Sequence, residues 1–427
     1  MTTLNQFLVR VRRMNPQLKL FLTGIALLSI TGGIGESTFN NFLSDTFNLN
    51  AAARGLLEFP RELPGLLTAL FAGALFFLSE TRIAAFSALC IGIGMLGIAI
   101  WGASWTVMLV FMFVWNTGMH MMMPVRSSIG MELAHAEHKG RRLGQIQGVG
   151  IAASIVGCAV VWILMKYLGA GYRTMFIIGG IVALLAAYVL FTMWMPNAHL
   201  QRPKFVFRRQ YWLYYLLAFL FGARKQIFIT FGPWVLIKIF NQPAYIFAQL
   251  WMVAGVLGIV FQPALGRAID RFGERWVLMV DSVLVFLVCI GYGYAHLIGS
   301  HALALGLLYA CFVGDLLLFG TNIARDTYLA KIALKPEDVA PSLSMGVSIN
   351  HAVSMSVPAL GGLMWMKYGH ASVFLAAAGV AVVMLFFSNL IRTGIRLRPS
   401  AFTVAPIPTS QRVGKVEAMA DTPVDGA

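Results

Sequence analysis

Residues 82–102 read RIAAFSALCIGIGMLGIAIWG, and their one charged side chain, Arg82, stands at the first position. A helix of about 20 mostly apolar residues is long enough to cross the hydrocarbon core of a bilayer. Eleven further stretches of the chain share this character. The twelve predicted spans are residues 18–46, 52–79, 82–102, 104–133, 141–168, 171–195, 210–238, 243–268, 274–297, 301–331, 338–367 and 370–393. The sequence therefore predicts an all-α integral membrane protein with twelve transmembrane helices.

The composition and the placement of charge agree with this class. Only 11% of the residues are charged, against about 25% in soluble domains. In a soluble chain the net charge of +15 would indicate a nucleic-acid partner. Here most Lys and Arg side chains fall in alternate loops at one face, as the positive-inside rule predicts. We therefore expect a multi-pass protein of a bacterial cytoplasmic (inner) membrane, with both termini in the cytoplasm and no nucleic-acid partner.

Several functional classes are disfavoured because their sequence signatures are missing. The four cysteines lie inside apolar spans without metal-ligand spacing. The sequence has no Walker loop, and no arrangement of Ser, His and Asp indicates a catalytic triad. We therefore predict a protein that is not an enzyme, needs no cofactor and is not driven by ATP.

The chain contains an internal duplication. Residues 162–176, WILMKYLGAGYRTMF, align with residues 362–374, GLMWMKYGHASVF, and Arg126 then aligns with Arg325. A repeat of about half the chain predicts two six-helix bundles related by a pseudo-two-fold axis. The expected segments are a cytoplasmic N-terminal segment 1–17, an N-terminal bundle 18–195, a cytoplasmic linker 196–209, a C-terminal bundle 210–395 and a disordered cytoplasmic tail 396–427.

A motif after the eighth predicted span carries a family resemblance. Residues 266–278, GRAIDRFGERWVL, resemble the cytoplasmic G-x-x-x-D-R-x-G-x-R motif of the major facilitator superfamily. The number of spans, the duplication and the basic central loop also fit, so the resemblance covers about residues 15–395. It implies alternating access between the two bundles. It also implies a conformational latch at the cytoplasmic end, formed by Gly266, Asp270, Arg271, Gly273 and Arg275.

Three further patterns refine the resemblance. The N-terminal counterpart of the motif, GALFFLSETRIAAF, keeps only Gly73, Glu80 and Arg82. In MPVRSSIGMEL, Arg126 precedes Gly130 by four residues, which resembles a fourth-helix motif common in proton-coupled members. The fifth span lacks the Gly-Pro pair that is usual in drug antiporters, and this disfavours a drug exporter.

Charged and amide side chains inside the spans are candidates for substrate binding, because a buried charge costs several kcal/mol in a membrane unless it is paired or hydrated. Spans one, four, seven and ten line the cavity in the family that the chain resembles. We predict that Arg224 or Lys225 anchors a carboxylate or phosphate, with Asn40 and Asn322 as further substrate-binding residues. Adjacent helical residues differ by about 100°, so at most one of the two cations points into the cavity. The alternative is that both pair with acids on neighbouring helices and only stabilise the bundle.

Two carboxylates are candidates for proton coupling. Glu36 in the first span is the first candidate, and Asp315 in the tenth span is the second. A carboxylate in a dry cavity titrates nearer to neutral pH, and a neighbouring Arg can reverse this effect. A fixed ion pair is the alternative role for each residue.

Other charged residues suit gating. Arg126 and Arg325 occupy matched positions in the two repeats, and Asp326 follows Arg325. Glu58, Arg61 and Glu62 lie at i, i+3 and i+4, hence on one face of the second span. In the resembled family this span lies between the halves near the outer side, so we predict an outer-gate ion network.

One cluster indicates a different cargo. His120 and Met123 lie in the fourth span, and His351 lies in the eleventh. His and Met side chains are ligands for transition metals such as iron or copper. Packing of these side chains in the membrane is the simpler alternative.

The sequence as a whole predicts a monomeric secondary transporter that works by alternating access in the lipid bilayer. The leading hypothesis for its activity is proton-coupled movement of a small organic anion or zwitterion. The alternatives are a transition-metal ion carrier, a drug or metabolite exporter, and a non-transporting sensor or assembly partner.

Overall fold

A computed structural model of the protein describes residues 14–67, 78–134, 139–195 and 207–392, and within these ranges it contains helices and no strands. Residues 1–13, most of the expected linker and the whole of the expected tail lie outside the described residues. The same holds for Gly73 and for residues 68–77 of the second predicted span.

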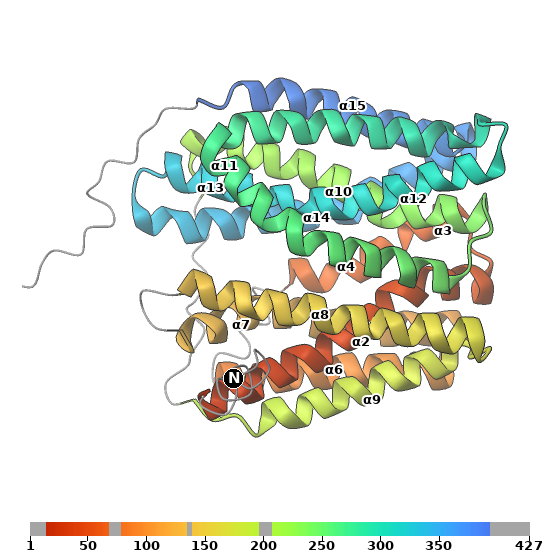
Figure 1. Ribbon diagram of the computed structural model, residues 1–427, viewed down its shortest axis with the longest axis vertical. Coiled ribbons are helices and arrows are strands. Elements are labelled where there is room, and N and C mark those ends of the chain that lie inside the picture. Colours follow the sequence, from red (N-terminus) through yellow and green to blue (C-terminus); the bar gives the residue numbers. More distant parts are fainter. Residues whose placement is uncertain (1–13, 68–77, 135–138, 196–206, 393–427) are drawn as a thin grey trace, which may run out of the picture.

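Seven helices of the described residues precede the linker, and most of them pack together as the N-terminal bundle (Figure 1). They are α2 (Pro16–Phe47), α3 (Ala51–Leu56), α4 (Glu58–Leu66), α6 (Glu80–Trp101), α7 (Trp105–Glu132), α8 (Lys139–Tyr167) and α9 (Tyr172–Phe191). The asparagine before α2 and the asparagine before α3 cap these helices, since Asn15 accepts from Gln17 N–H and Asn50 accepts from Ala53 N–H.

The C-terminal bundle consists of the helices that follow the linker. They are η2 (Arg209–Tyr211), α10 (Trp212–Lys238), α11 (Ala244–Tyr294), η3 (Ala295–Leu297), α12 (His301–Leu318), η4 (Phe319–Thr321), α13 (Asn322–Ile332), η5 (Pro336–Asp338), α14 (Val339–Tyr368) and α15 (His370–Asn389). Gly273 interrupts α11 with φ 81°, a conformation that suits glycine. The chain turns there, so α11 contains both the eighth and the ninth predicted span.

Every one of the twelve predicted spans overlaps a described helix. Within the ranges that the structure describes, eight helical segments are long and apolar enough to cross a membrane by these two properties alone. Polar side chains near the middle of α10, among them Arg224, Lys225 and Gln226, lower its hydropathy. The predicted all-α membrane class is confirmed.

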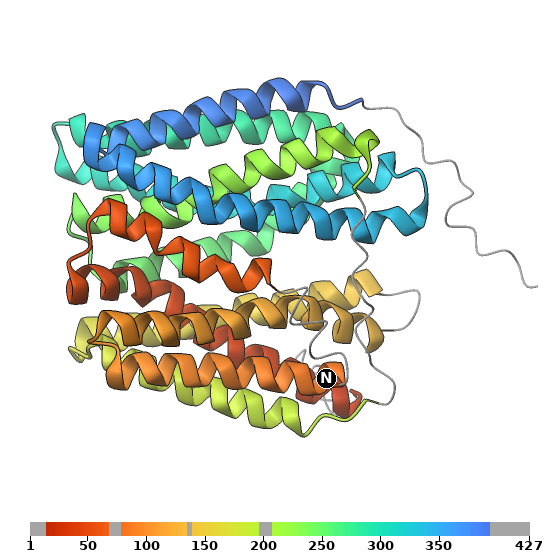
Figure 2. The same cartoon turned by 180° about the vertical axis from the view of Figure 1, so that it is seen from behind.

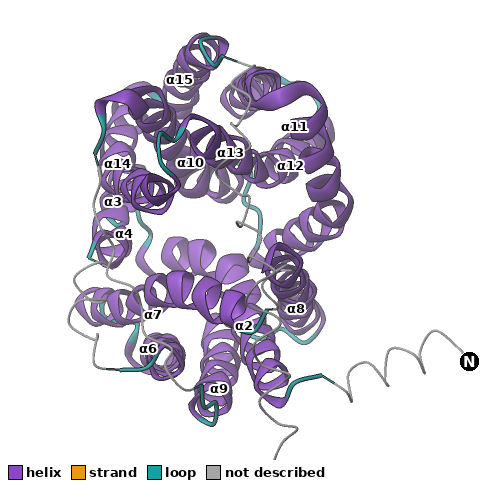
Figure 3. Cartoon of the chain, turned by 90° about the vertical axis from the view of Figure 1, so that its left-hand side faces the viewer, coloured by secondary structure: helices purple, strands orange, loops and turns teal. Residues whose placement is uncertain are grey.

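Each bundle has its own hydrophobic core. Met95, Trp115 and Phe176 pack in the N-terminal bundle, while Trp234 and Phe374 pack in the C-terminal one. Seen end-on, the helices separate into two groups (Figure 3). This arrangement places any site between the bundles on helices that belong to two separately packed units.

The two bundles touch at one end of the molecule. The end at which α2 begins and α9 and α15 end is the linker end (Figure 1). We call the opposite end, where the bundles touch, the far end. Figure 2 shows α3 and α4 lying beside α14. A Cβ atom on Gly55 would lie 2.1 Å from the Pro358 carbonyl oxygen, and one on Gly362 would lie 2.4 Å from that of Ala51. Glycine therefore permits backbone contact between the bundles at this crossing.

Hydrogen bonds reinforce the contact at the far end. Asn41 Nδ2 donates to the Gln242 carbonyl oxygen at 2.8 Å, and Lys238 Nζ donates to Asn48 Oδ1 at 3.3 Å. Both bonds join α2 or the residue after it to the segment around the end of α10. The described conformation is thus closed at the far end.

Candidate functional site

A cavity of about 340 Å³ lies between the two bundles. Its aromatic wall belongs to the C-terminal bundle and comprises Phe228, Phe247, Trp251, Tyr292, Phe312 and Phe319. The polar side chains that the N-terminal bundle contributes are Glu36, Asn40, Arg61, Glu62, Asn116 and His120. Lys225, Asp315 and His351 are the charged or titratable side chains that line it from the C-terminal bundle. The volume and the mixture of apolar and polar groups suit a small organic molecule.

The two adjacent cations of α10 point in different directions. Arg224 is fully buried and is not among the residues that line the cavity. Its Nη2 lies 3.4 Å from Asp315 Oδ1 and 3.8 Å from Asp281 Oδ1, and its guanidinium lies 5.5 Å from the ring centres of Phe221 and Phe319. As placed, Arg224 holds three helices of the C-terminal bundle together and does not reach a solute in the cavity.

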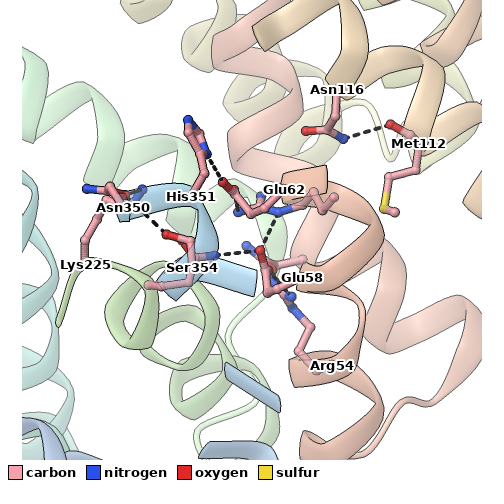
Figure 4. A network of polar contacts seen from close by, with 12 residues as sticks. Arg54, Glu58, Glu62, Met112, Asn116, Lys225, Asn350, His351 and Ser354 are labelled. Carbon is pink, nitrogen blue, oxygen red and sulfur yellow. Dashed lines mark hydrogen bonds and ion pairs between the residues drawn. The ribbon is translucent and has the colours of Figure 1, made fainter. Parts of the chain in front are cut away.

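Lys225 is the cation of α10 that faces the cavity. Its Nζ donates to Asn350 Oδ1 at 2.8 Å (Figure 4), and no carboxylate of the described residues lies within 4.0 Å of it. An ammonium group has three donors, so two remain for a ligand or water. This is a cation inside a membrane protein that no acid of the described chain neutralises directly.

Glu36 faces the cavity from α2. Its side chain is exposed there, and it makes no hydrogen bond or ion pair within the described ranges. Asn40, one turn further along α2, lines the same cavity, but its Oδ1 accepts from Arg54 Nη2 at 2.9 Å. The amide nitrogen of Asn40 remains as a possible donor to a solute.

A buried ion network lies between the cavity and the far end. Glu58 is fully buried, pairs with the buried Arg54 and accepts from Arg61 Nε at 2.7 Å. Gln226 Nε2 of the other bundle donates to Glu58 Oε2 at 2.6 Å, and Arg61 Nη2 lies 3.6 Å from Glu62 Oε1. The structure thus brings the three predicted gate residues together and, through Gln226, joins them to α10. Figure 4 shows Arg54, Glu58 and Glu62 of this network.

Two histidines meet beside this network. His351 Nδ1 of α14 lies 2.9 Å from Glu62 Oε2 (Figure 4), and the ring centres of His120 and His351 are 4.9 Å apart. Met123, the third residue of the predicted metal cluster, lines the same cavity and is 55% exposed.

Comparison with known proteins identifies the family. The model of the Major Facilitator Superfamily matches residues 21–327. The chain belongs to the major facilitator superfamily.

Solved structures of the superfamily share this fold at low sequence identity. The nucleoside transporter NupG is 16% identical, with a TM-score of 0.71 over 89% of this chain and 100% of that chain. A bacterial homolog of the human lysosomal transporter Spinster, inward-facing and occupied, is 17% identical with a TM-score of 0.67 over 90% and 98%. A D-xylose–proton symporter is 16% identical with a TM-score of 0.65 over 89% and 98%. No curated protein matches the sequence significantly.

Membership and fold support secondary transport of a small molecule by a multi-pass membrane protein. The identities are too low to carry over a substrate, so the cargo must be argued from this cavity.

The matched arginines of this superfamily member bind within their own bundles. Arg126 Nη2 donates to Gln147 Oε1 at 3.2 Å and to the Ile146 carbonyl oxygen at 3.3 Å. Arg325 donates to the Leu217 carbonyl oxygen at 3.3 Å and to Asn322, and it lies 3.5 Å from the centre of the Phe221 ring.

Asn322 is occupied by these contacts. Its Nδ2 donates to Asp326 Oδ2 at 3.2 Å, and the residue is not among those that line the cavity. The structure therefore places Asn322 and Asp326 with Arg325, away from the solute position that the sequence predicted for Asn322.

The superfamily motif lies at the turn inside α11. Asp270 and Arg271 are exposed, and Arg275 Nη2 donates to Asn389 Oδ1 at 2.5 Å. A Cβ on Gly266 would have no atom within 4 Å among the described residues, so no neighbouring helix packs closely against this glycine of the predicted latch. In this conformation the three charged residues of the motif do not form the expected cluster.

Four residues of these networks were not predicted from the sequence. Glu274 is buried and lies 2.6 Å from Lys331 Nζ. Asp281 and Gln226 lie inside apolar spans, where a polar side chain is itself a signal. Arg54, in α3, is fully buried and pairs with Glu58, four residues later on the same helical face.

Proposed function

We propose that the protein is a proton-coupled secondary transporter that carries a small organic anion or zwitterion by alternating access. The observation that carries the proposal is Lys225, a cation that faces the cavity without a carboxylate partner among the described residues. Desolvating an unpaired ammonium is costly, and a carboxylate or phosphate group of the solute would offset that cost.

The charge balance around the cavity favours an anionic group near Lys225. Arg61 pairs with Glu58 and Glu62, and Arg224 lies between Asp281 and Asp315. Lys225 and Glu36 remain without ion pairs in the described chain. A zwitterion would satisfy both, whereas an anion would need only Lys225 and leave Glu36 to carry a proton.

The aromatic wall favours a solute with an apolar or ring-shaped body. Trp251, Tyr292 and Phe319 are among its members, and flat apolar groups pack well against such side chains. Sugars and nucleosides, the cargoes named for two of the structural neighbours, have ring bodies but need no anchoring cation. They are the natural negative comparisons in a binding screen.

Alternating access in this proposal is rocking of the N-terminal bundle, residues 18–195, against the C-terminal bundle, residues 210–395. The far end is closed in the described conformation, so the solute enters from the linker end. With both termini in the cytoplasm of a bacterium, this is the inward-facing state of a monomer in the inner membrane. The proposal includes no enzymatic step and no cofactor.

Replacing Lys225 by alanine is expected to weaken binding of the solute about 10–100-fold, because a hydrogen bond to a charged group contributes about 1.5–3 kcal/mol. The ligand is first found by thermal shift of the purified protein over carboxylates, amino acids, nucleosides, sugars and metals. A ligand at about 100 times its Kd stabilises the protein by about 2.7 kcal/mol.

Lys367→Ala, at an exposed position of α14, is the matched control, and Lys225→Arg should retain part of the affinity. Equal affinity in Lys225→Ala and the wild type would refute the anchor.

Replacing Glu36 by glutamine is expected to abolish the response of uptake to a pH gradient while leaving solute exchange intact. Glutamine keeps the size of the side chain, but its amide cannot bind and release a proton as a carboxylate does. Proteoliposomes with an imposed gradient measure concentrative uptake, and counterflow without a gradient measures exchange. Glu132→Gln, at the exposed end of α7, is the control. Unchanged proton flux in Glu36→Gln would show that another carboxylate couples transport to protons, and Asp315 would be tested next.

A further inference from the structure

Three potential metal ligands meet between the bundles, next to the cavity. Glu62 of α4, His120 of α7 and His351 of α14 each offer one ligand atom, and these atoms all lie within 4.8 Å of one another. Glu62 and His120 are each 7% exposed, and His351 is 9% exposed. It is the one group of three such side chains found within the described residues.

An unpartnered nitrogen points to an occupant. Nδ1 of His120 is buried and has no hydrogen-bond partner among the described residues, although buried polar atoms are nearly always bonded. The neighbouring imidazole, His351, is already positioned by Glu62 at 2.9 Å. A positively charged ligand near both rings and the carboxylate would satisfy this nitrogen.

The backbone leaves space for the two rings to approach. A Cβ on Gly65 would lie 2.6 Å from His351 Nδ1 and 2.9 Å from His120 Cε1. Any larger residue there would therefore displace the imidazoles. Glycine at this turn of α4 keeps both rings beside Glu62.

We propose that Glu62, His120 and His351 bind a divalent transition-metal ion of the Zn²⁺ class that bridges the two bundles. Two imidazoles and one carboxylate are a ligand set that Zn²⁺ favours, with the fourth position left for water. At about 2.0–2.1 Å from a tetrahedral ion, ligand atoms lie about 3.3 Å apart. The three atoms now lie within 4.8 Å of one another, so the most distant pair would move closer by at most about 1.5 Å when the ion binds. Mg²⁺ and Ca²⁺ prefer all-oxygen shells and are excluded by the imidazoles.

The site has a conformational consequence because its ligands come from both bundles. Glu62 and His120 belong to the N-terminal bundle, and His351 belongs to the C-terminal one. These three side chains can hold one ion together in the state in which the far end is closed. Because the ion binds that state more tightly, it shifts the conformational equilibrium toward it. Its role is thus distinct from that of the solute anchor Lys225, and the inference holds whatever the solute is.

Direct metal binding tests the site without a transport assay. Full-length purified protein is freed of metal with a chelator and titrated with Zn²⁺ against a chromophoric competitor. We expect one ion per chain, with affinity at least tenfold lower in His120→Gln and in His351→Gln. The control is His370→Gln, because His296 and His370 form a similar pair with ring centres 4.7 Å apart but belong to no three-ligand group of the described chain. Wild-type affinity in either cavity-histidine variant would overturn the site.

A spectroscopic measurement on the wild-type protein tests the same site without any variant that could misfold. Co²⁺ bound in a four-coordinate site gives intense visible absorption bands, whereas six-coordinate Co²⁺ gives weak ones. We expect the intense bands, and their displacement by one equivalent of Zn²⁺. Weak bands alone would overturn the proposed coordination.

Hydrogen–deuterium exchange tests the bridge between the bundles. Zn²⁺ should slow exchange in peptides of α4 and of the middle of α14 in the wild type, but not in His351→Gln. Binding without slower exchange in α14 would refute the bridge. These readouts do not depend on any solute, so a failure of the organic-anion proposal would leave them unaffected.

Discussion

Replacing Arg224 by methionine is expected to lower the free energy of unfolding by about 3–5 kcal/mol, the usual loss when one partner of a buried ion pair is removed. Arg224 is fully buried, and its guanidinium lies between the carboxylates of Asp281 and Asp315. Without it, two buried carboxylates on α11 and α12 lose their counter-charge. Unfolding in mixed micelles at increasing fractions of SDS, followed by tryptophan fluorescence, measures the change.

A compensating variant separates structural loss from loss of solute binding. Arg224→Met combined with Asp281→Leu and Asp315→Leu removes all three charges, and replacement of a buried ionic group by apolar side chains is often neutral. We expect most of the lost stability to return. Arg267→Ala, at an exposed position of α11, should change stability by less than about 0.5 kcal/mol. Wild-type stability of Arg224→Met together with loss of solute binding would instead make Arg224 the anchor.

Replacing Glu58 by glutamine is expected to destabilise the closed far end by a similar amount, about 3–5 kcal/mol. Glu58 is the common partner of Arg54, Arg61 and Gln226. Glutamine keeps the shape but leaves the fully buried Arg54 without its carboxylate. Because Gln226 belongs to the other bundle, the loss weakens the contact between the bundles as well as α3 and α4 themselves.

The state of the far end can be measured with a cysteine at Ala51, which is buried where α3 crosses α14. A membrane-impermeant maleimide should label Ala51→Cys slowly, and faster by at least tenfold when Glu58→Gln is added. Glu132→Gln is a charge-matched control far from this contact. If Glu58→Gln labels at the parent rate and unfolds at the parent SDS fraction, the network does not hold the far end closed.

The sequence was sufficient for the fold because a bilayer acts on each helix separately. A helix must satisfy its own backbone hydrogen bonds in lipid, so every span carries its apolar signal within about 20 residues. The duplication and the motif at Gly266 to Arg275 then indicated two bundles, and the family match over residues 21–327 established the superfamily. The positive φ of Gly273 lies at the turn of that motif.

The site was only partly accessible from the sequence. The i, i+3, i+4 spacing of Glu58, Arg61 and Glu62 gave their common face, since such neighbours are fixed by the helix itself. Arg54 precedes Glu58 by four residues and so belongs to the same face, but it was not among the predicted gate residues. Asp281 was missed although an acid inside an apolar span was visible in the sequence.

What the sequence determined by itself is the membrane class, the spans, the two-bundle repeat and the list of intramembrane charges. Only the tertiary structure decided that Lys225 faces the cavity while Arg224 meets Asp281 and Asp315. It alone placed His351 against Glu62 from the other bundle. The physical reason is that helical periodicity fixes the angle between neighbours on one helix. The rotation of the helix about its axis, and hence the partner of each charge, is set by packing against helices that are distant in sequence.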